Sequence, residues 1–262
     1  MTLDDAMSER IRLQTARMRS VETIPNWADG AAISPDPQAG RFFRRAKCLE
    51  GRFVVLYSGN LGLAHRFDAV LEVAKRCVVE LPEVLFLFVG NGARLHEVRE
   101  AAKCLPNVRF MDYQPREKLN EVYNAADIHL VTLRDEVSGM LFPSKYPAAL
   151  AAGKPVLLNG AHGAPFEREI QSKSLGWTCQ HDPSTIMAAI QEAMKNPEKR
   201  QAMGRNARQV FDMRYSKTIA MQRWELVLNS VLTGERIAGE VLVNTGDVVV
   251  FDKKKTASAG SV

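Results

Sequence analysis

The chain has 262 residues, of which 46% are hydrophobic and 25% are charged, so it is long enough to form one sizeable globular core. Its 35 Lys and Arg residues against 30 Asp and Glu give a formal charge of +5, a mildly basic balance that argues against a nucleic-acid-binding protein. No run of about 18 to 20 apolar residues could span a membrane, and the polar amino terminus does not resemble a signal peptide. We therefore expect a cytoplasmic protein, with contact at the inner face of a membrane as a further option.

The four cysteines are widely spaced, with no CxxC pair and no histidine at the spacing of a metal site. We interpret them as reduced structural thiols and predict no bound metal. Basic residues gather at 41–47 (RFFRRAK) and 253–255 (KKK). Such clusters are most often a solvated surface, and attraction to a phosphate-rich partner or an anionic membrane is the sharper alternative.

The start of the chain predicts little independent structure. Residues 4–19 have the pattern of a helix with few apolar residues, and residues 21–24 have that of a short strand. Residues 25–40 hold three prolines and two glycines, a composition typical of a linker. We expect a domain boundary here, with residues 25–50 as an interdomain linker.

From residue 53 onward, short apolar segments alternate with amphipathic ones. We predict strands at 53–57, 84–89, 108–111, 127–132, 155–158 and around Trp177, and helices at 66–80, 93–104, 116–124, 145–152, 165–173, 184–195, 198–211 and 216–232. This alternation is typical of a parallel sheet with helices on both faces, that is, a doubly wound α/β domain over residues 51–215. Residues 234–262 combine a candidate hairpin (241–243 and 248–250) with a tail that we expect to be mobile.

Two glycine-rich turns follow the first two predicted strands. The segment VVLYSGNLG (54–62) places Gly59 and Gly62 after the first, and FVGNG (88–92) places Gly90 after the second. Glycine lets backbone N–H groups approach a ligand, and in a doubly wound sheet ligands bind beyond the carboxyl ends of the strands. The two turns together predict a phosphate-binding rim, although either turn alone could use glycine only for its geometry.

A third segment, SGMLFPSK (138–145), runs into a predicted helix. Ser138, Gly139, Ser144 and Lys145 would bring backbone donors, hydroxyls and an ammonium together, a combination that suits a diphosphate. The alternative makes Ser144 a helix N-cap and Lys145 a solvated charge.

The five histidines are interpreted as structural. His129 lies within a predicted strand, whereas His162 lies in a loop at the expected rim, where it could touch a sugar. Glu167 and Glu169 are interpreted as charges in the first turn of a helix.

Taken in order, these segments resemble the family 4 glycosyltransferases. The similar segments are IPNWAD (24–29), VVLYSGNLG (54–62), FVGNGARL (88–95), AADIHLV (125–131), SGMLFPSK (138–145), AALAAGKPVL (148–157) and the closing MGRNAR, YSK and RW. The likeness runs from about residue 4 to residue 232 and is strongest to the branch that builds capsule, colanic-acid and O-antigen polysaccharides. It implies a retaining enzyme of the GT-B fold, in which two Rossmann-like domains face each other across a cleft.

In that family the C-terminal domain binds the nucleotide-sugar donor, and an N-terminal domain of similar size binds the acceptor. By resemblance, residues 1–24 correspond to the end of an acceptor domain that is otherwise largely absent, and residues 51–215 correspond to the donor-binding domain. Residues 216–233 correspond to the helix that crosses back to the acceptor domain. The resemblance therefore implies a donor-binding half.

The resemblance also assigns residues to the donor. Lys145 and Arg66 would stabilise the negative charge that grows on the leaving diphosphate, which gives them catalytic roles. The positions expected to bind the substrate are Gly59, Asn60, Gly62 and Gly90 in the glycine turns, Tyr113 and Gln114 against the base, Ser138, Gly139 and Met140 at the sugar, and Ser144 and Lys145 at the phosphates.

One departure from the family concerns the ribose. Many relatives carry two glutamates eight positions apart, the second of which holds the ribose hydroxyls. This chain has Met140 and Ala148 at the matching positions. The resemblance therefore supplies no carboxylate for the ribose.

We predict a glycosyltransferase donor half that uses a nucleoside diphosphate sugar with retention, for polysaccharide or lipopolysaccharide assembly, and that needs no metal or other cofactor. A separately encoded acceptor-domain subunit is an expected partner, bound through the exposed faces of the first helix and of helix 216–232. Two alternatives stay open: a non-catalytic nucleotide-sugar-binding remnant or subunit, and an unrelated α/β protein such as a sugar-nucleotide epimerase.

Overall fold

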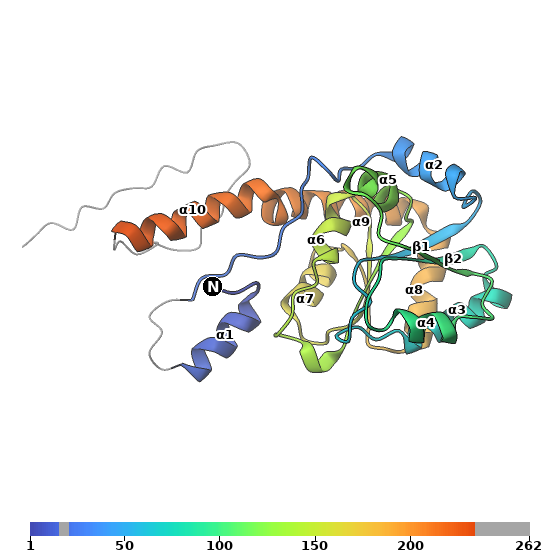
Figure 1. Cartoon of the computed structure of the whole chain (residues 1–262), viewed down its shortest axis with the longest axis horizontal. Coiled ribbons are helices and arrows are strands. Elements are labelled where there is room, and N and C mark those ends of the chain that lie inside the picture. Colours follow the sequence, from blue (N-terminus) through green and yellow to red (C-terminus); the bar gives the residue numbers. More distant parts are fainter. Residues whose placement is uncertain (16–20, 234–262) are drawn as a thin grey trace, which may run out of the picture.

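A six-stranded parallel sheet forms the centre of the molecule. The computed structural model describes residues 1–15 and 21–233 (Figure 1). The strands are β1 (Phe53–Ser58), β2 (Val84–Val89), β3 (Val108–Met111), β4 (Ile128–Leu133), β5 (Val156–Gly160) and β6 (Gly176–Cys179), and their spatial order is β3-β2-β1-β4-β5-β6. This order is that of a doubly wound sheet, so the predicted fold class is confirmed.

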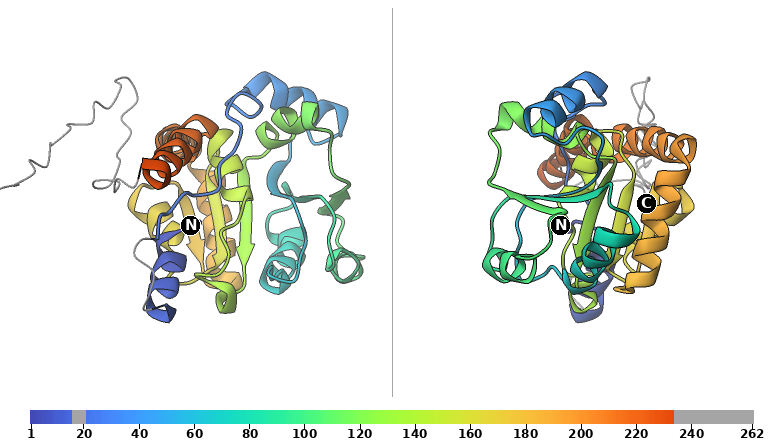
Figure 2. Two further views of the ribbon diagram at one scale, coloured as in Figure 1. Left: turned by 60° about the vertical axis from the view of Figure 1, so that its left-hand side comes forward. Right: turned by 90° about the vertical axis from the view of Figure 1, so that its right-hand side faces the viewer.

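Helices cover both faces of this sheet (Figure 2). They are α1 (Asp5–Gln14), α2 (Pro37–Ala46), α3 (Asp68–Glu80), α4 (Leu95–Ala101), α5 (Leu119–Asn124), α6 (Lys145–Ala151), α7 (Pro165–Ser172), α8 (Pro183–Lys195), α9 (Pro197–Val210) and α10 (Lys217–Thr233). Three short helical segments, η1 (Arg116–Lys118), η2 (Asp135–Val137) and η3 (Phe211–Tyr215), connect some of them. Among the residues described, no helix is both long and apolar enough to cross a bilayer.

The central strands are buried on both faces, which explains their unbroken apolar sequences. Alternate residues of β1 point to opposite sides: Val55 and Tyr57 pack with α3 and α8, whereas Val54 and Leu56 pack with α2 and α5. A third cluster lies between α6, α7, η3 and the β4–β5 half of the sheet. The sheet therefore has a core on each face, as its sequence pattern predicts.

The predicted linker contains a helix that the sequence interpretation missed. Within residues 25–50, Asp36 accepts hydrogen bonds from two amides of the first turn of α2, and Pro37 occupies its first position. Phe43 is buried against the sheet, and a Cβ at Gly40 would lie 2.4 Å from the carbonyl oxygen of Asn124 in α5. The glycine that resembled a linker residue thus allows two helices to pack closely.

The chain start also differs from expectation. The described part of the predicted helix 4–19 is α1, and residues 16–20 lie outside the description. The predicted strand 21–24 is a single parallel bridge between Thr2 and Thr23, whose hydroxyls and that of Ser8 lie together. The predicted hairpin at 241–250 and the tail lie outside the described residues.

Glu169 is not a surface charge, as its position in a first helical turn suggested. Its side chain is 8% exposed and accepts hydrogen bonds from the hydroxyls of Tyr146, at 2.8 Å, and Tyr215, at 2.6 Å. Arg214 pairs with its other oxygen at 2.6 Å. Glu167 is also buried and accepts from the amide of Gly163. The Glu169 network joins α6 and α7 to the segment that leads into α10.

We predict that Glu169→Ala lowers the free energy of unfolding by about 3 kcal/mol, because it leaves two buried phenol groups and one arginine without their acceptor. Urea denaturation followed by circular dichroism measures this change. Glu198→Ala, in the exposed first turn of α9, is the control and should change stability by less than about 0.5 kcal/mol. Equal effects of the two substitutions would contradict a structural role for the Glu169 network.

Candidate functional site

The two predicted glycine turns meet at the carboxyl ends of β1 and β2. Gly59 has φ +135° and Gly90 has φ +140°, conformations that other residues rarely adopt. A Cβ on Gly90 would lie 2.1 Å from the carbonyl oxygen of Gly59, so the two backbones could not approach this closely with any side chain at position 90. Both turns therefore need glycine for their own packing, whatever they bind.

Lys145 extends from the start of α6 into this rim. Its side chain is only 8% exposed, and its Nζ lies 4.8 Å from the ring centroid of Tyr57. The ammonium donates to Nε2 of His65 at 3.1 Å and lies 3.5 Å from the carbonyl oxygen of Asn60. A Cβ on Gly59 would lie 3.1 Å from its Cε. The alternative of a solvated lysine is therefore wrong.

The imidazole of His65 contacts the ammonium of Lys145 from inside the domain. Its Nδ1 bonds to the carbonyl oxygen of Thr132 at the end of β4, which requires a proton on Nδ1 and leaves Nε2 as the acceptor for Lys145. Burial, and then the nearby Lys145, lowers the pKa of His65 to about 4. Arg94 donates to the His65 carbonyl and pairs with Glu97. The sequence interpretation gave His65 no role at the site, because nothing in its spacing shows that α6 brings Lys145 to it.

Burial also changes the acid strength of Lys145, since it lowers the pKa of the ammonium to about 8. No carboxylate among the described residues forms an ion pair with Lys145. The rim therefore holds a positive charge that is poorly solvated and unneutralised, an arrangement that favours an anionic ligand.

The glycine-turn residues provide fewer free amides than the sequence suggested. The N–H groups of Gly59 and Leu61 donate to the carbonyl oxygens of Val89 and Asn91. Within the described residues, the backbone N–H groups of Asn60 and Gly62 donate to no acceptor. These two amides are the ones that the first turn can offer to an anion.

Several predicted site residues lie around the same rim. A Cβ on Gly62 would lie 2.8 Å from the side-chain nitrogen of Asn60, and the ring of Tyr113 packs over Gly90. Tyr113 is 57% exposed and therefore available to a ligand. Gln114 follows it and hydrogen-bonds within its own loop, to the carbonyl oxygen of Asp112.

Two residues that were predicted to contact the phosphates are not among the contacts of Lys145. We call Lys145 with its contacts Tyr57, Asn60 and His65 the Lys145 cluster. Arg66 is half exposed and pairs with Asp68 at 3.1 Å. Ser144 occupies the N-cap position of α6, as the alternative proposed, but it is exposed and its side chain forms no capping hydrogen bond.

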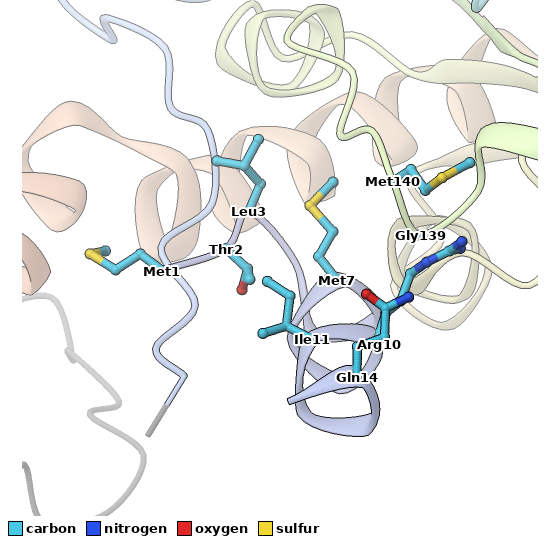
Figure 3. A pocket seen from close by; sticks show the side chains of 9 residues that line it. All are labelled: Met1, Thr2, Leu3, Met7, Arg10, Ile11, Gln14, Gly139 and Met140. Carbon is cyan, nitrogen blue, oxygen red and sulfur yellow. The ribbon is translucent and has the colours of Figure 1, made fainter. Parts of the chain in front are cut away.

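The loop of Ser138, Gly139 and Met140, which was predicted to bind the sugar and which we call the sugar loop, lies beside the start of the chain. Gly139 and Met140 line an open cavity of about 350 Å³ together with α1 and residues 1–3. Figure 3 shows Arg10 of α1 extending toward Gly139 and Met140 across this space. Ser138 donates to the carbonyl oxygen of His162, which places that loop beside the sugar loop. The contribution of α1 had no signal in the sequence.

The structure also shows the surroundings of His129 and of Ala148, the residue matched to the ribose glutamate. His129 is buried, with Nε2 3.0 Å from the carbonyl oxygen of Tyr123 and its ring stacked on the Tyr123 ring, so its interpretation as a structural histidine is confirmed. Ala148, at the position matched to the ribose glutamate, is 7% exposed and lies one helical turn after Lys145. Within residues 1–15 and 21–233, no group of three or more His, Cys, Asp or Glu side chains is placed to hold a metal ion.

Comparison with known proteins identifies the family. Residues 41–210 match the family model of glycosyl transferases group 1, which is well over half of the chain. The chain belongs to the group 1 glycosyl transferases. The family membership that the sequence resemblance implied is thereby confirmed.

The curated relatives of this glycosyl transferase are longer than the chain itself. WbjE of Pseudomonas aeruginosa, named as a glycosyltransferase, is 27% identical over 223 residues, which cover 84% of this chain and 54% of that protein. WcaI of Escherichia coli K12, whose name assigns it to colanic acid biosynthesis, is 23% identical over 87% of this chain and 53% of its own length. The chain therefore spans about half the length of the relatives it matches.

Solved glycosyltransferase structures share the fold of this group 1 chain. HepE of Anabaena, solved in complex with UDP-glucose, superposes with a TM-score of 0.69 at 17% identity and covers 80% of this chain and 57% of its own. WaaG, involved in lipopolysaccharide biosynthesis, gives a TM-score of 0.68 at 18% identity over 87% of this chain and 62% of its own. The likeness supports a Rossmann-like domain of the GT-B type.

We predict that the His65 ring stays neutral, with its proton on Nδ1, down to about pH 4, because burial and the adjacent ammonium disfavour a second proton. Nitrogen-15 NMR of the ring during a pH titration measures both tautomer and charge. The same residue in urea should titrate near pH 6.5. Protons are thus taken up only by the unfolded chain between these values, so this group's stabilising contribution is lost as the pH falls from about 6.5 to 4. A folded-state ring protonated on Nε2 at neutral pH would contradict the contact with Lys145.

Proposed function

We propose that this chain binds a nucleoside diphosphate sugar at the carboxyl rim of its sheet and serves as the donor-binding part of a retaining glycosyltransferase. The observation that carries the proposal is the buried ammonium of Lys145, which lies at the meeting point of the β1 turn and α6. An anionic diphosphate would neutralise this charge. The UDP-glucose complex of the structurally similar HepE supports a donor of this class.

In the proposed reaction the anomeric carbon–oxygen bond to the diphosphate breaks, and a bond to an acceptor hydroxyl oxygen forms on the same face of the sugar. The electron pair of the broken bond goes to the diphosphate, and the acceptor proton is transferred to a diphosphate oxygen or to solvent. Lys145 stabilises the growing negative charge by a fixed, poorly solvated positive charge, and the free amides of Asn60 and Gly62 add dipoles. Arg66 contributes after it leaves Asp68. With these groups the reaction needs no resident metal or other cofactor.

The acceptor side of the reaction is also part of the proposal. We propose that the acceptor approaches the anomeric carbon through the cavity between the sugar loop and α1. The chain spans about half the length of these curated relatives, and the proposal includes a partner that binds the acceptor, such as a separate acceptor-domain subunit. Exposed apolar residues of α10, Leu228, Val231 and Leu232, offer it a surface. The name of WcaI, which assigns that protein to colanic acid biosynthesis, supports polysaccharide assembly as the setting.

The family match favours neither of the two alternatives. A sugar-nucleotide epimerase would act on a free nucleotide sugar without an acceptor. A non-catalytic subunit would bind the donor without transfer; the alanine at position 148 is the single observation on its side.

Calorimetric titration with UDP-, GDP- and dTDP-sugars tests the proposal directly. We expect saturable binding to donors of one base, and Lys145→Ala should weaken it by more than about 1 kcal/mol, or roughly fivefold, the scale of a charge-assisted contact. Lys154→Ala is a matched control, because Lys154 is partly buried and burial lowers its pKa to about 8 as well, but it precedes the amino end of β5. If the folded chain binds none of these donors, the proposed function is wrong.

The pH dependence of donor binding provides a second prediction. Lys145 has a pKa of about 8 in the free protein, and a bound diphosphate should raise that pKa, so the donor prefers the protonated form. Affinity should therefore be constant below pH 8 and fall by up to about tenfold per pH unit above it. Lys145→Arg, which stays charged, should abolish the decline, and Lys154→Arg should preserve it. The same decline in the Lys145→Arg variant would show that another group titrates.

A further inference from the structure

The outer face of α2 presents cations around an exposed aromatic ring. Arg41, Phe42 and Arg45 are exposed at positions that share one side of the helix, while Gly40 and Phe43 face inward. Phe42 is 61% exposed and is the one large apolar side chain that α2 leaves in solvent. The helix is anchored to the domain by its inner face, so its outer face is free for another contact.

Other elements add positive charge to this face. Lys118 places its Nζ 5.7 Å from the Phe42 ring centroid. Arg109 of β3 donates to the carbonyl oxygens of Lys47 and Cys48, at 2.9 and 3.2 Å, which brings its guanidinium to the end of α2. We call this set, Arg41, Phe42, Arg45, Lys47, Arg109 and Lys118, the α2 surface.

Most of these cations have no carboxylate partner. Among the described residues, Lys118 pairs with Glu121, whereas the other four basic residues of the α2 surface form no ion pair. Arg44, in the same basic run, instead turns inward to Asp127. The other carboxylates nearby in sequence are Asp36, Glu50, Asp112 and Glu117. Residues 37–49 contain no Asp or Glu, so the positive charge is concentrated on α2 itself.

We propose that the α2 surface docks this protein on a bilayer that contains anionic headgroups. Guanidinium and ammonium groups would pair with lipid phosphates, and the Phe42 ring would enter the interfacial region between them. A protein partner is a poorer fit, because a stable protein interface needs an apolar core of many side chains and α2 exposes one such ring. The inference is independent of the proposed function, since the α2 surface shares no residue with the Lys145 cluster.

Vesicle sedimentation of the full chain tests the proposal. Vesicles of phosphatidylcholine alone are compared with vesicles that also contain phosphatidylglycerol, at low and at physiological salt. We expect binding only to the anionic vesicles, weaker at higher salt, and at least about tenfold weaker for the double variant Arg41→Glu, Arg45→Glu. Phe42→Ser should also weaken binding at low salt, because it removes the inserted ring rather than a charge.

Matched controls distinguish the α2 surface from charge in general. The double variant Lys75→Glu, Lys173→Glu reverses the same number of exposed charges on other faces, and Val79→Ser replaces an apolar residue that is 85% exposed in α3. Lys253, Lys254 and Lys255 are present in every variant, so their contribution cancels. Circular dichroism verifies that each variant is folded.

Three outcomes would overturn the proposal. One is equal loss of binding in the two double variants; another is equal binding of the wild-type chain to neutral and anionic vesicles. The third is binding of RNA or of an acidic protein through the α2 surface without any binding to vesicles, which would assign the surface to a different class of partner.

Discussion

The site depends on the reversal of strand order between β1 and β4 at the middle of the sheet. At this point the connections from neighbouring strands leave to opposite faces, which in doubly wound sheets opens a space between the loops that follow the strands. The close contact between the turns at Gly59 and Gly90 closes one side of that space. The bond from His65 to the carbonyl oxygen at the end of β4 ties the first turn to the other half of the sheet.

The ammonium of Lys145 is placed in this space at an energetic cost. A pKa lowered from 10.5 to about 8 corresponds to on the order of 3 kcal/mol of lost solvation. The contacts that offset this cost, the Tyr57 ring, the imidazole of His65 and the carbonyl oxygen of Asn60, are all neutral. Because no carboxylate neutralises the charge, an anionic ligand recovers stabilisation that the free protein lacks. In the proposed function, affinity for a diphosphate would come from Lys145, and the choice of sugar would depend on the loop at Gly139 and Met140 beside α1.

The start of the described chain lies beside that sugar loop, and most of α10 is not buried against the domain. Only Ile219 and Ala220 of α10 are buried, and α1 contributes a wall of the cavity beside Met140. In Figure 1 both helices extend to the same side of the domain. The Glu169 network fixes the direction in which the chain leaves the domain toward α10, because Tyr215 and Arg214 both belong to the segment just before it.

The fold class, most element positions and the two glycine turns could be predicted from the amino-acid sequence. Strands β2 and β3 have the predicted bounds, since β-branched and aromatic runs between turns are local signals. Glycine at 59 and 90 was likewise informative, because φ restrictions act within single residues. The helix α2 was missed even though Asp36 and Pro37 form a helix start, since its glycine and prolines resembled a linker and the packing against Asn124 depends on a segment far along the chain.

Only the tertiary structure decided which charges are buried and which side chains meet. Lys145 could have been solvated, His65 structural and Glu169 a helix-terminal charge on local evidence alone. The environment of each side chain depends on residues more than 40 positions away in sequence. His65 and Lys145 are 80 positions apart, and Glu169 and Tyr215 are 46 positions apart. Desolvation and hydrogen bonding depend on such distant neighbours, so the sequence provided the candidate groups and the fold determined their chemistry.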